Sequence, residues 1–428
     1  MSQASFAAST PFTLLPFEKK LDRLAEVAVR VGVGLQPDQE LVITAPIEAQ
    51  LLVRHITEHA YKAGARLVTT FYADDAASLA RYQYAPDSSF DYAPTWYYDA
   101  LAAAYRSNAA RMGITGADPA LLAGQDPARV SRANAAASRA YKPAMELITR
   151  FAINWTIVAA ATPAWASLVF PEASSERALA NLWDAIFRTS RITGEDPVED
   201  WRQHNANISR RVDLLNSKRY HSLHFFTSGN APNGGTDLTV GLADQHLWCG
   251  GGATAANGVY CNANIPTEEC FTTPHRERVN GHVAASKPLS HQGTLIEDIR
   301  CTFENGRIVD ATATAGQDAL RKLISTDEGA CRLGEVALVP HNSPIAQSGI
   351  LFWNTLFDEN AASHIALGQA YSTCLVGGES MPQEQLASLG ANHSLIHVDW
   401  MIGGPAMNVD GLFADGSSEP LMRDGDWV

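Results

Sequence analysis

Two short apolar segments with an amphipathic segment between them occupy residues 40–72, whose sequence is ELVITAPIEAQLLVRHITEHAYKAGARLVTTFY. Residues 40–44 have the length and composition of a short buried strand, and residues 66–72 have those of a second strand. Residues 47–63 have apolar side chains at helical spacing, and Gly64 follows them as a helix stop. This strand–helix–strand order predicts a parallel βαβ unit and hence an α/β domain.

The same alternation of helix and strand extends on both sides of this unit. Residues 17–31 have an amphipathic pattern that predicts a helix. The Asp-Pro pair at 126–127 predicts the start of another helix, in which Pro143 should cause an end or a kink. A strand at 155–160 and helices between residues 175 and 216 complete the expected N-terminal domain.

Beyond Tyr220 the sequence changes to short strand patterns rich in Gly, Thr and Val. Asn-Gly at 305–306 is a strong hairpin pattern, and Asp-Gly at 410–411 predicts a second hairpin. A chain of 428 residues exceeds the usual size of one domain. We therefore predict an α/β domain at residues 1–219, with a parallel βαβ core, and a strand-rich α+β domain at residues 220–428.

Composition limits the class of partner and the compartment. Charged residues make up 18% of the chain and hydrophobic residues 46%, which is ordinary for a globular enzyme. The net charge of -14 argues against a nucleic-acid partner, because phosphate neutralisation needs a basic surface. The opening Met1–Ala7 lacks the features of a signal peptide, and no apolar stretch is long enough to span a membrane. The 6 cysteines include no Cys-x-x-Cys pair, so we expect reduced thiols and a cytoplasmic protein.

The first candidate for metal chemistry is a strand pattern at residues 394–402. Because side chains alternate along a strand, His397 and Asp399 project side by side from one face. Such a pair is half of a site for a divalent cation. The alternative is a half-buried strand whose polar face meets solvent or a salt bridge. The other face of the strand is apolar and consists of Ile396, Val398, Trp400 and Ile402.

Further acidic and histidine side chains recur upstream in apolar, glycine-rich surroundings. Two adjacent glutamates follow a proline-stiffened turn, a third starts a predicted strand at 335–339, and acids precede a histidine at 358–364. Each alone could be solvated, end a strand or cap a helix. Because buried acids without partners are costly, the group as a whole indicates a bound cation. The residues are Glu268, Glu269, Glu335, Asp358, Glu359 and His364.

The number of candidate ligands indicates the kind of metal site. Three glutamates, one aspartate and two histidines exceed the needs of one tetrahedral zinc and suit two divalent ions bridged by a carboxylate. Oxygen-rich coordination favours Zn, Co, Mn or Mg in exchangeable sites, and two such ions can activate a water for attack on an amide. The main alternative is a mononuclear non-haem Fe(II) oxygenase that uses His364, His397 and Asp399 alone. A binding protein with a closed structural metal is a weaker alternative.

A second histidine pattern competes with this group. His55, Glu58 and His59 match the His-x-x-Glu-His pattern of one class of zinc peptidases. The predicted helix buries its opposite side, however, so His55 should face water and His59 should lie at the boundary. We therefore interpret the match as a chance occurrence.

Four motifs together resemble the family of aminopeptidase T, aminopeptidase S and PepS, which are dinuclear metallo-aminopeptidases. This resemblance implies a two-domain homodimer whose C-terminal domain holds two metal ions. The expected activity is removal of N-terminal residues from short peptides. The motifs are IPTEE at 265–269 with FTTP at 271–274, DEG at 327–329 with LGEV at 333–336, DEN at 358–360 with HIALG at 364–368, and HVD at 397–399.

The same resemblance assigns roles to individual residues. Tyr371 corresponds to a catalytic side chain that would donate to the tetrahedral oxyanion. It lies seven residues beyond His364 and would share its face if a helix continued through Gly368. Glu268 is a candidate general base, with a solvated or merely supporting acid as the alternative. The implied metal ligands are Glu269, Glu335, Glu359, His364, His397 and Asp399.

Overall fold

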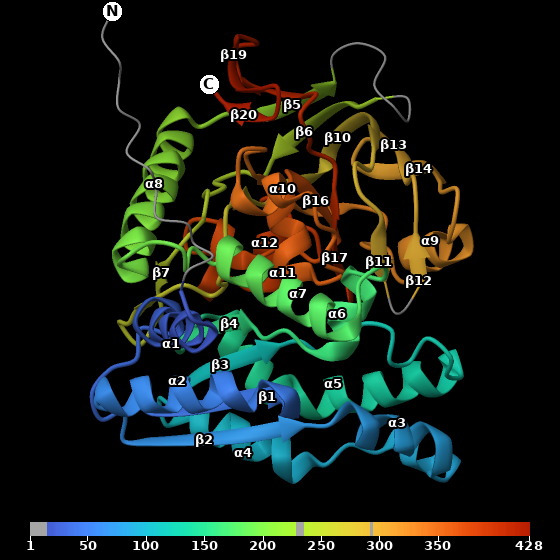
Figure 1. Cartoon of the computed structure of the whole chain (residues 1–428). Helices are drawn as coiled ribbons and strands as arrows, with labels where there is room; N and C mark the ends of the chain where they lie inside the picture. Colours follow the sequence, from blue (N-terminus) through green and yellow to red (C-terminus); the bar gives the residue numbers. More distant parts are fainter. Residues whose placement is uncertain (1–14, 228–234, 292–293) are drawn as a thin grey trace, which may run out of the picture.

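The computed structural model describes residues 15–227, 235–291 and 294–428. The opening Met1–Ala7 lies outside these residues. Figure 1 shows a helix-covered sheet below and a strand-rich part above it. None of the helices within the described ranges combines the length and the apolar character that a membrane crossing requires.

The lower part is built on a parallel sheet with strand order β2-β1-β3-β4. Its strands are β1 (Glu40–Pro46), β2 (Leu67–Ala73), β3 (Ala110–Thr115) and β4 (Trp155–Ala159). A 3₁₀ turn (Ile47–Ala49) and α2 (Gln50–Lys62) connect β1 to β2. The βαβ unit predicted from residues 40–72 is therefore confirmed. β1 and α2 bury apolar side chains in the core, and β2 is the partly exposed edge strand of the sheet.

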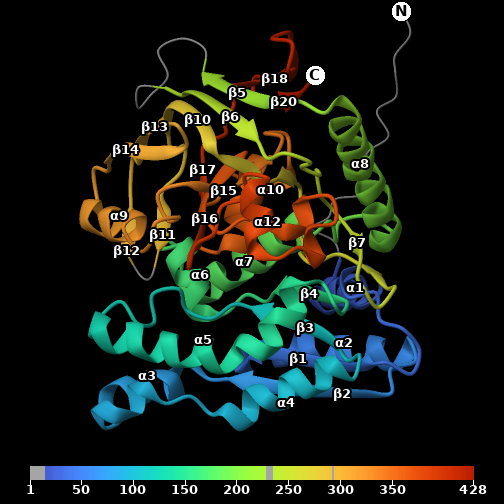
Figure 2. The ribbon, with the colours of Figure 1, turned by 180° about the vertical axis from the view of Figure 1, so that it is seen from behind.

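Helices cover both faces of this sheet. α1 (Phe17–Val27), which ends in a π-helical turn (Ala28–Gly32), packs with α2 on one face. α4 (Thr95–Arg106) and α5 (Pro127–Thr149) pack on the other. Figure 1 views the sheet from the side of α2, and Figure 2 from the side of α4 and α5. α3 (Asp75–Tyr84) follows β2.

The helix predicted to start at Asp126 forms, but it does not end at Pro143. α5 begins after Asp126 as expected, but it continues through Pro143 to Thr149. Ala144 and Ile148 beyond the proline are buried in the core under the sheet. This burial offsets the hydrogen bond that proline cannot donate.

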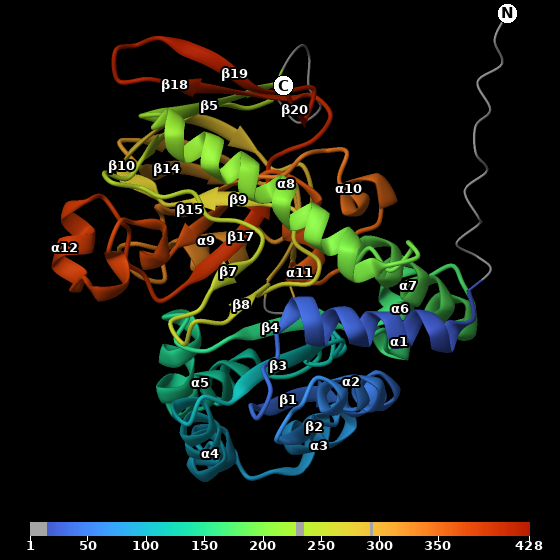
Figure 3. The ribbon, with the colours of Figure 1, turned by 90° about the vertical axis from the view of Figure 1, so that its left-hand side faces the viewer.

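Three helices lead to the upper part of the molecule. They are α6 (Pro163–Val169), α7 (Ser175–Thr189) and α8 (Pro197–Lys218). Figure 3 shows α8 running obliquely from the level of α1 to the strands above. The hydrophobic core of the lower sheet also includes Ile265, Phe352 and Phe357 from the C-terminal half. The domain division at residue 220 stays a prediction.

Two antiparallel sheets form most of the upper part. The larger has the order β14-β13-β10-β6-β5-β18-β19-β20, and the smaller has the order β17-β16-β15-β9. The larger consists of β5 (Ser222–Thr227), β6 (Asp237–Leu242), β10 (Pro274–Ala284), β13 (Arg300–Glu304), β14 (Arg307–Thr312), β18 (Met407–Leu412), β19 (Ser418–Arg423) and β20 (Asp426–Trp427). The smaller consists of β9 (Cys270–Thr272), β15 (Leu333–Leu338), β16 (His364–Gly368) and β17 (His397–Met401).

Short elements complete this part. Two small hairpins pair β7 with β8 and β11 with β12. The strands are β7 (Ala253–Thr254), β8 (Tyr260–Cys261), β11 (Leu289–His291) and β12 (Thr294–Ile296), and the helices are α9 (Gln317–Ile324), α10 (Pro344–Ser348), α11 (Thr355–Asp358) and α12 (Gln383–Ser388).

The two hairpin predictions have different outcomes. Asn305 and Gly306, both with positive φ, join β13 to β14 as predicted. The prediction of a hairpin turn at 410–411 is wrong, because both residues lie inside β18. Gly411 is required there for packing rather than for a turn, since a Cβ would meet the Tyr220 ring at 2.4 Å.

Candidate metal centre

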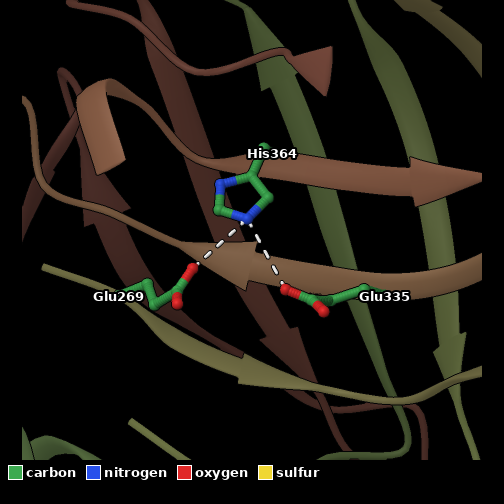
Figure 4. A group of neighbouring side chains, drawn as sticks. All are labelled: Glu269, Glu335 and His364. Atoms are coloured by element: carbon green, nitrogen blue, oxygen red, sulfur yellow. Dashed lines mark ion pairs between the residues drawn. The ribbon is translucent and has the colours of Figure 1, made fainter. Parts of the chain in front are cut away.

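The four-stranded sheet carries acidic and histidine side chains on one face. β15 supplies Glu335, β16 begins with His364, and β17 supplies His397 and Asp399. Glu269 immediately precedes β9, which pairs with β15. Figure 4 shows Glu269 and Glu335 pointing toward the His364 ring from two different segments.

Strand register explains why these side chains meet. Ala366 of β16 pairs with Glu335 on one side and with Asp399 on the other, so the three residues form one row. The two histidines lie two residues before members of this row and therefore point to the same face. The opposite face of β17 packs into the C-terminal core. The alternation predicted for residues 394–402 is confirmed.

Glu335 lies between the two histidines. His364 Nε2 is 3.5 Å from Glu335 Oε1 and 3.3 Å from Glu269 Oε2. His397 Nε2 is 3.6 Å from Glu335 Oε2 and 3.5 Å from Asp399 Oδ1. Each carboxylate oxygen of Glu335 thus faces a different imidazole.

These contacts define two overlapping donor groups. In each group one atom per residue lies within 4.8 Å of the others. Because Glu335 belongs to both groups, it stands where a bridging carboxylate would stand. Glu359 is half-buried and, together with Asp399, borders an adjoining cavity. The groups are Glu269, Glu335 and His364, and Glu335, His397 and Asp399.

The protein balances the charges of this cluster only in part. Burial and neighbouring carboxylates raise the pKa of Glu335 and of Glu359. Burial favours neutral His397, but Asp399 and Glu335 outweigh it and raise the pKa of His397 to about 9. Asp399 Oδ1 is buried and, within the described residues, makes no hydrogen bond beyond its ion-pair contact with His397. Several buried carboxylates beside two imidazoles suit divalent cations, so the donor set fits a metal ion.

Backbone carbonyls orient both histidines. His364 Nδ1 is 3.1 Å from the carbonyl oxygen of Ala362, and His397 Nδ1 is 2.7 Å from that of Gln369. An Nδ1–H that donates to a carbonyl leaves Nε2 unprotonated in the neutral ring. Both Nε2 atoms are the ones that face the carboxylates.

Tyr371 reaches this centre by a different route from the one expected. Residues 364–368 form a strand rather than a helix, because they are hydrogen-bonded on both sides to β15 and β17. Tyr371 precedes a short 3₁₀ turn (Ser372–Cys374), and its ring centroid lies 4.7 Å from that of His397. Partial burial and the nearby carboxylates raise the pKa of its phenol, so the hydroxyl stays protonated.

Glu268 points away from solvent into an ion pair. Its side chain is 4% exposed, and its two oxygens accept from Arg191 Nη1 and Nη2 at 2.5 and 2.9 Å. Its backbone N–H donates to Asn360 Oδ1 at 2.8 Å. A solvated Glu268, one of the alternatives above, is therefore wrong. Arg191 escapes sequence reasoning because it stands 77 positions away and belongs to no motif.

The His-x-x-Glu-His pattern lies in α2, where it contacts α1. His59 Nε2 is 2.8 Å from Asp22 Oδ1, and His55 Nε2 is 3.3 Å from Glu18 Oε2. The prediction that His55 faces water is partly wrong, because its side chain is only 24% exposed. Across the described ranges, neither histidine belongs to a group that could hold a metal.

A small cavity of about 70 Å³ adjoins the centre. Glu359 and Asp399 form part of its wall. The rest of its lining is mixed. It combines polar and apolar side chains, namely Ser290, Asn354, Thr355 and Asp358 with Pro288, Leu289, Leu351, Trp353 and Met401.

Comparison with known proteins extends these observations to the whole chain. A family model described as "Thermophilic metalloprotease (M29)" matches residues 17–427. Aminopeptidase T of Thermus thermophilus is 51% identical over 412 residues, which are 96% of this chain and 99% of that protein. Aminopeptidase AmpS of Bacillus subtilis is 43% identical over 412 residues, with 96% and 99% covered.

Two solved structures are also similar. Wild-type AmpT from Thermus thermophilus superimposes with a TM-score of 0.91 at 50% identity, covering 96% of this chain and 100% of that one. A 2,5-dihydroxypyridine dioxygenase from Pseudomonas putida has a TM-score of 0.51 at 12% identity, covering 96% of each chain. The second likeness concerns the fold alone.

Proposed function

The chain belongs to the M29 family of metalloproteases, and we propose that its carboxylate–histidine cluster holds two divalent ions. The protein is a metal-dependent aminopeptidase, as its relatives over 96% of the chain are. We assign the ions to Zn, Co, Mn or Mg, which such oxygen-rich donors accept. The proposed ligands are Glu269, Glu335, Glu359, His364, His397 and Asp399.

The observation that carries the two-ion proposal is the shared position of Glu335. Its two oxygens face different histidines, each of which belongs to its own donor group. A single ion would leave one of these groups with only a protonated imidazole to balance its buried carboxylates. Two ions would use both groups.

The residues of the chain have separate tasks in this proposal. When bound, the ions would polarise the scissile carbonyl and lower the pKa of the attacking water. Tyr371 donates a hydrogen bond from its hydroxyl to the oxyanion that develops on the substrate, and its raised pKa keeps the proton in place. The carbonyls of Ala362 and Gln369 keep His364 and His397 turned with Nε2 toward the centre.

Glu268 is better suited to positioning than to proton transfer. A general base needs a free oxygen within reach of the reacting proton. Both Glu268 oxygens accept from Arg191, and the Glu268 backbone is bonded to Asn360, which follows Glu359. These bonds support a role in holding the adjacent Glu269 and the segment of Glu359.

We propose the remaining features by analogy with the family. We propose short peptides as substrates, a homodimer as the working form and the cytoplasm as its location. The negative net charge of -14 supports a partner other than nucleic acid.

The oxygenase alternative has less support. It requires His364, His397 and Asp399 to act as one isolated site. His364 instead shares its donor group with two glutamates, Glu269 and Glu335. The likeness to a dioxygenase at 12% identity shows the fold alone.

Elemental analysis of protein purified without chelator tests the proposal. We expect two divalent ions per chain and release of the N-terminal residue from a leucyl peptide. At most one ion at full loading, with peptidase activity retained, would contradict the dinuclear site. Iron-dependent oxygen consumption without peptide cleavage would favour the oxygenase.

A further inference from the structure

A second cavity, of about 500 Å³, lies at the carboxyl ends of β1, β2 and β3. Residues 44–46, 71–73 and 113–117 line it, and the six proposed metal ligands do not. The chain reaches β2 on one side of β1 and β3 on the other, and α2 and α4 cover opposite faces. The cavity therefore lies where these connections diverge, which is the place where open parallel sheets bind ligands.

Arg111 of β3 is the cation of this cavity. Within the described residues it makes no ion pair, and its Nε and Nη1 atoms are buried without a hydrogen-bond partner. Its guanidinium lies 5.6 Å from the centroid of the Trp155 ring. A ring contact stabilises the face of a guanidinium but leaves its N–H groups unsatisfied. The described residues therefore supply no acceptor for these two atoms of Arg111.

The backbone leaves room for this guanidinium. Arg111 and Gly113 lie on the same face of β3, and a Cβ at Gly113 would be 3.2 Å from Arg111 Nη2. Gly113 pairs with Thr44 of β1 and with Ile157 of β4, so the guanidinium lies over the row that borders the cavity. The absence of a side chain at Gly113 lets the Arg111 head reach the cavity.

The lining of the cavity defines the rest of a ligand. A carboxylate would offer the planar, two-oxygen acceptor that matches a guanidinium fork. Phe71, Tyr72 and Tyr97 supply aromatic surface beside it. The one acid in the lining, Asp75, already accepts from the backbone N–H of Asp118 at 2.8 Å. We propose that this cavity binds a small carboxylate with an apolar side chain, anchored by Arg111.

Two sources could supply this chemistry. One is a free small carboxylate. The other is the C-terminus of the peptide being cleaved, and this source rests on the proposed function. A contact between the two cavities supports the second source. Thr115, which lines the larger cavity, accepts a hydrogen bond from Asn354 Nδ2 at 2.9 Å. Asn354 also lines the small cavity beside the metal centre.

Calorimetric titration of the metal-loaded enzyme tests the site itself. The probes are 4-methylpentanoate and its neutral isostere 4-methylpentanamide. Neither has the free α-amino group of an aminopeptidase substrate. Wild type should bind the acid at least tenfold more tightly than the amide, and Arg111→Met should lose this preference. Arg106→Met, an exposed change of equal charge at the end of α4, should keep it. Because the described residues give Arg111 Nε and Nη1 no hydrogen-bond acceptor, Arg111→Met should have a Tm no lower than that of wild type. If its Tm is lower, Arg111→Gln serves as the second variant.

Steady-state kinetics on a tripeptide and on its C-terminal amide separates the two sources. If the peptide C-terminus is the occupant, Arg111→Met should raise KM at least tenfold for the acid and leave KM for the amide unchanged. If a free carboxylate is the occupant, both KM values should stay unchanged while the calorimetric preference is lost. The proposal is overturned if Arg111→Met changes neither the probe binding nor the acid-specific KM. A wild type without peptidase activity would contradict the proposed function and leave the titration interpretable.

Discussion

Arg191 donates to both carboxylate oxygens of Glu268, at 2.5 and 2.9 Å. Arg191 follows α7 in the N-terminal half, with φ at 56°, and lies over the Trp201 ring. Glu268 immediately precedes Glu269, which contacts His364 in the metal centre. The pair therefore ties the end of α7 to the segment that carries a proposed ligand.

Breaking this pair should cost stability before it costs chemistry. Glu268→Gln leaves the mostly buried Arg191 without its carboxylate partner, and Arg191→Met leaves buried Glu268 with only His204 Nε2, at 3.7 Å, beside it. Each should lower the free energy of unfolding by about 3–5 kcal/mol. The double variant should recover part of this loss. Urea denaturation measures the free energies, and kcat should fall while the shape of the pH–rate profile stays unchanged. A stable Glu268→Gln that loses the acidic limb of that profile would identify Glu268 as the general base.

Local patterns predict those elements that local residues determine. β1 and α2 follow the pattern of residues 40–72 because each buries its own apolar face, and β2 pairs with β1 along its whole length. Asp410 and Gly411 mislead, because a glycine that packs on Tyr220 cannot be told from a turn glycine in the sequence. α5 likewise continues through Pro143 because distant core residues bury its last turns.

The metal centre likewise contains residues that local sequence predicts and residues that it does not. His397 and Asp399 can be predicted from one strand, because alternation alone places them on the same face. Glu335 lies near both histidines because β15, β16 and β17 pair with one another, and no local pattern specifies this pairing. Arg191 and Arg111 belong to no sequence motif. Their roles depend on contacts with residues that are distant in sequence, such as Glu268 for Arg191 and Trp155 for Arg111.

Glu335→Gln tests the bridge. An amide carries no net charge and cannot balance two cations, so the variant should lose one ion per chain. Activity should fall by at least about 100-fold, which exceeds the loss typical of a residue that only supports a ligand. Elemental analysis and kcat/KM on a dipeptide amide are the measurements, and Glu328→Gln, an exposed glutamate, is the control. Full activity with both ions bound would remove Glu335 from the bridging position.

Metal removal should affect stability as well as activity. Burial raises the pKa of Glu335 and Glu359, which shows that their charged forms are disfavoured in the metal-free protein. Ions that bind only the folded state stabilise it by about 2.7 kcal/mol at a free concentration 100-fold above Kd. Chelation should therefore lower Tm and abolish peptide cleavage, and added Zn, Co, Mn or Mg should restore both. An unchanged Tm in scanning calorimetry would argue against a metal held by these residues.

His55→Ala and His59→Ala should leave metal content unchanged and the peptidase rate within a few-fold of wild type. Neither histidine faces the metal centre, and both contact acids of α1. Loss of the His59–Asp22 contact, which is partly exposed, should cost about 0.2–1 kcal/mol in the free energy of unfolding. Loss of bound metal in either variant would show that the α2 pattern is a ligand pair.

Tyr371→Phe separates oxyanion stabilisation from metal binding. The substitution keeps the ring that contacts His397 and removes only the hydroxyl. Burial and the carboxylates around it raise the pKa of Tyr371, so near neutral pH the phenol is a hydrogen-bond donor and a poor metal ligand. If it meets charge that develops only in the transition state, kcat and kcat/KM should fall together by about 10²–10³. KM and metal occupancy should barely change. A higher KM at unchanged kcat would show uniform substrate binding by Tyr371, and loss of metal would show that the hydroxyl is a ligand or supports one.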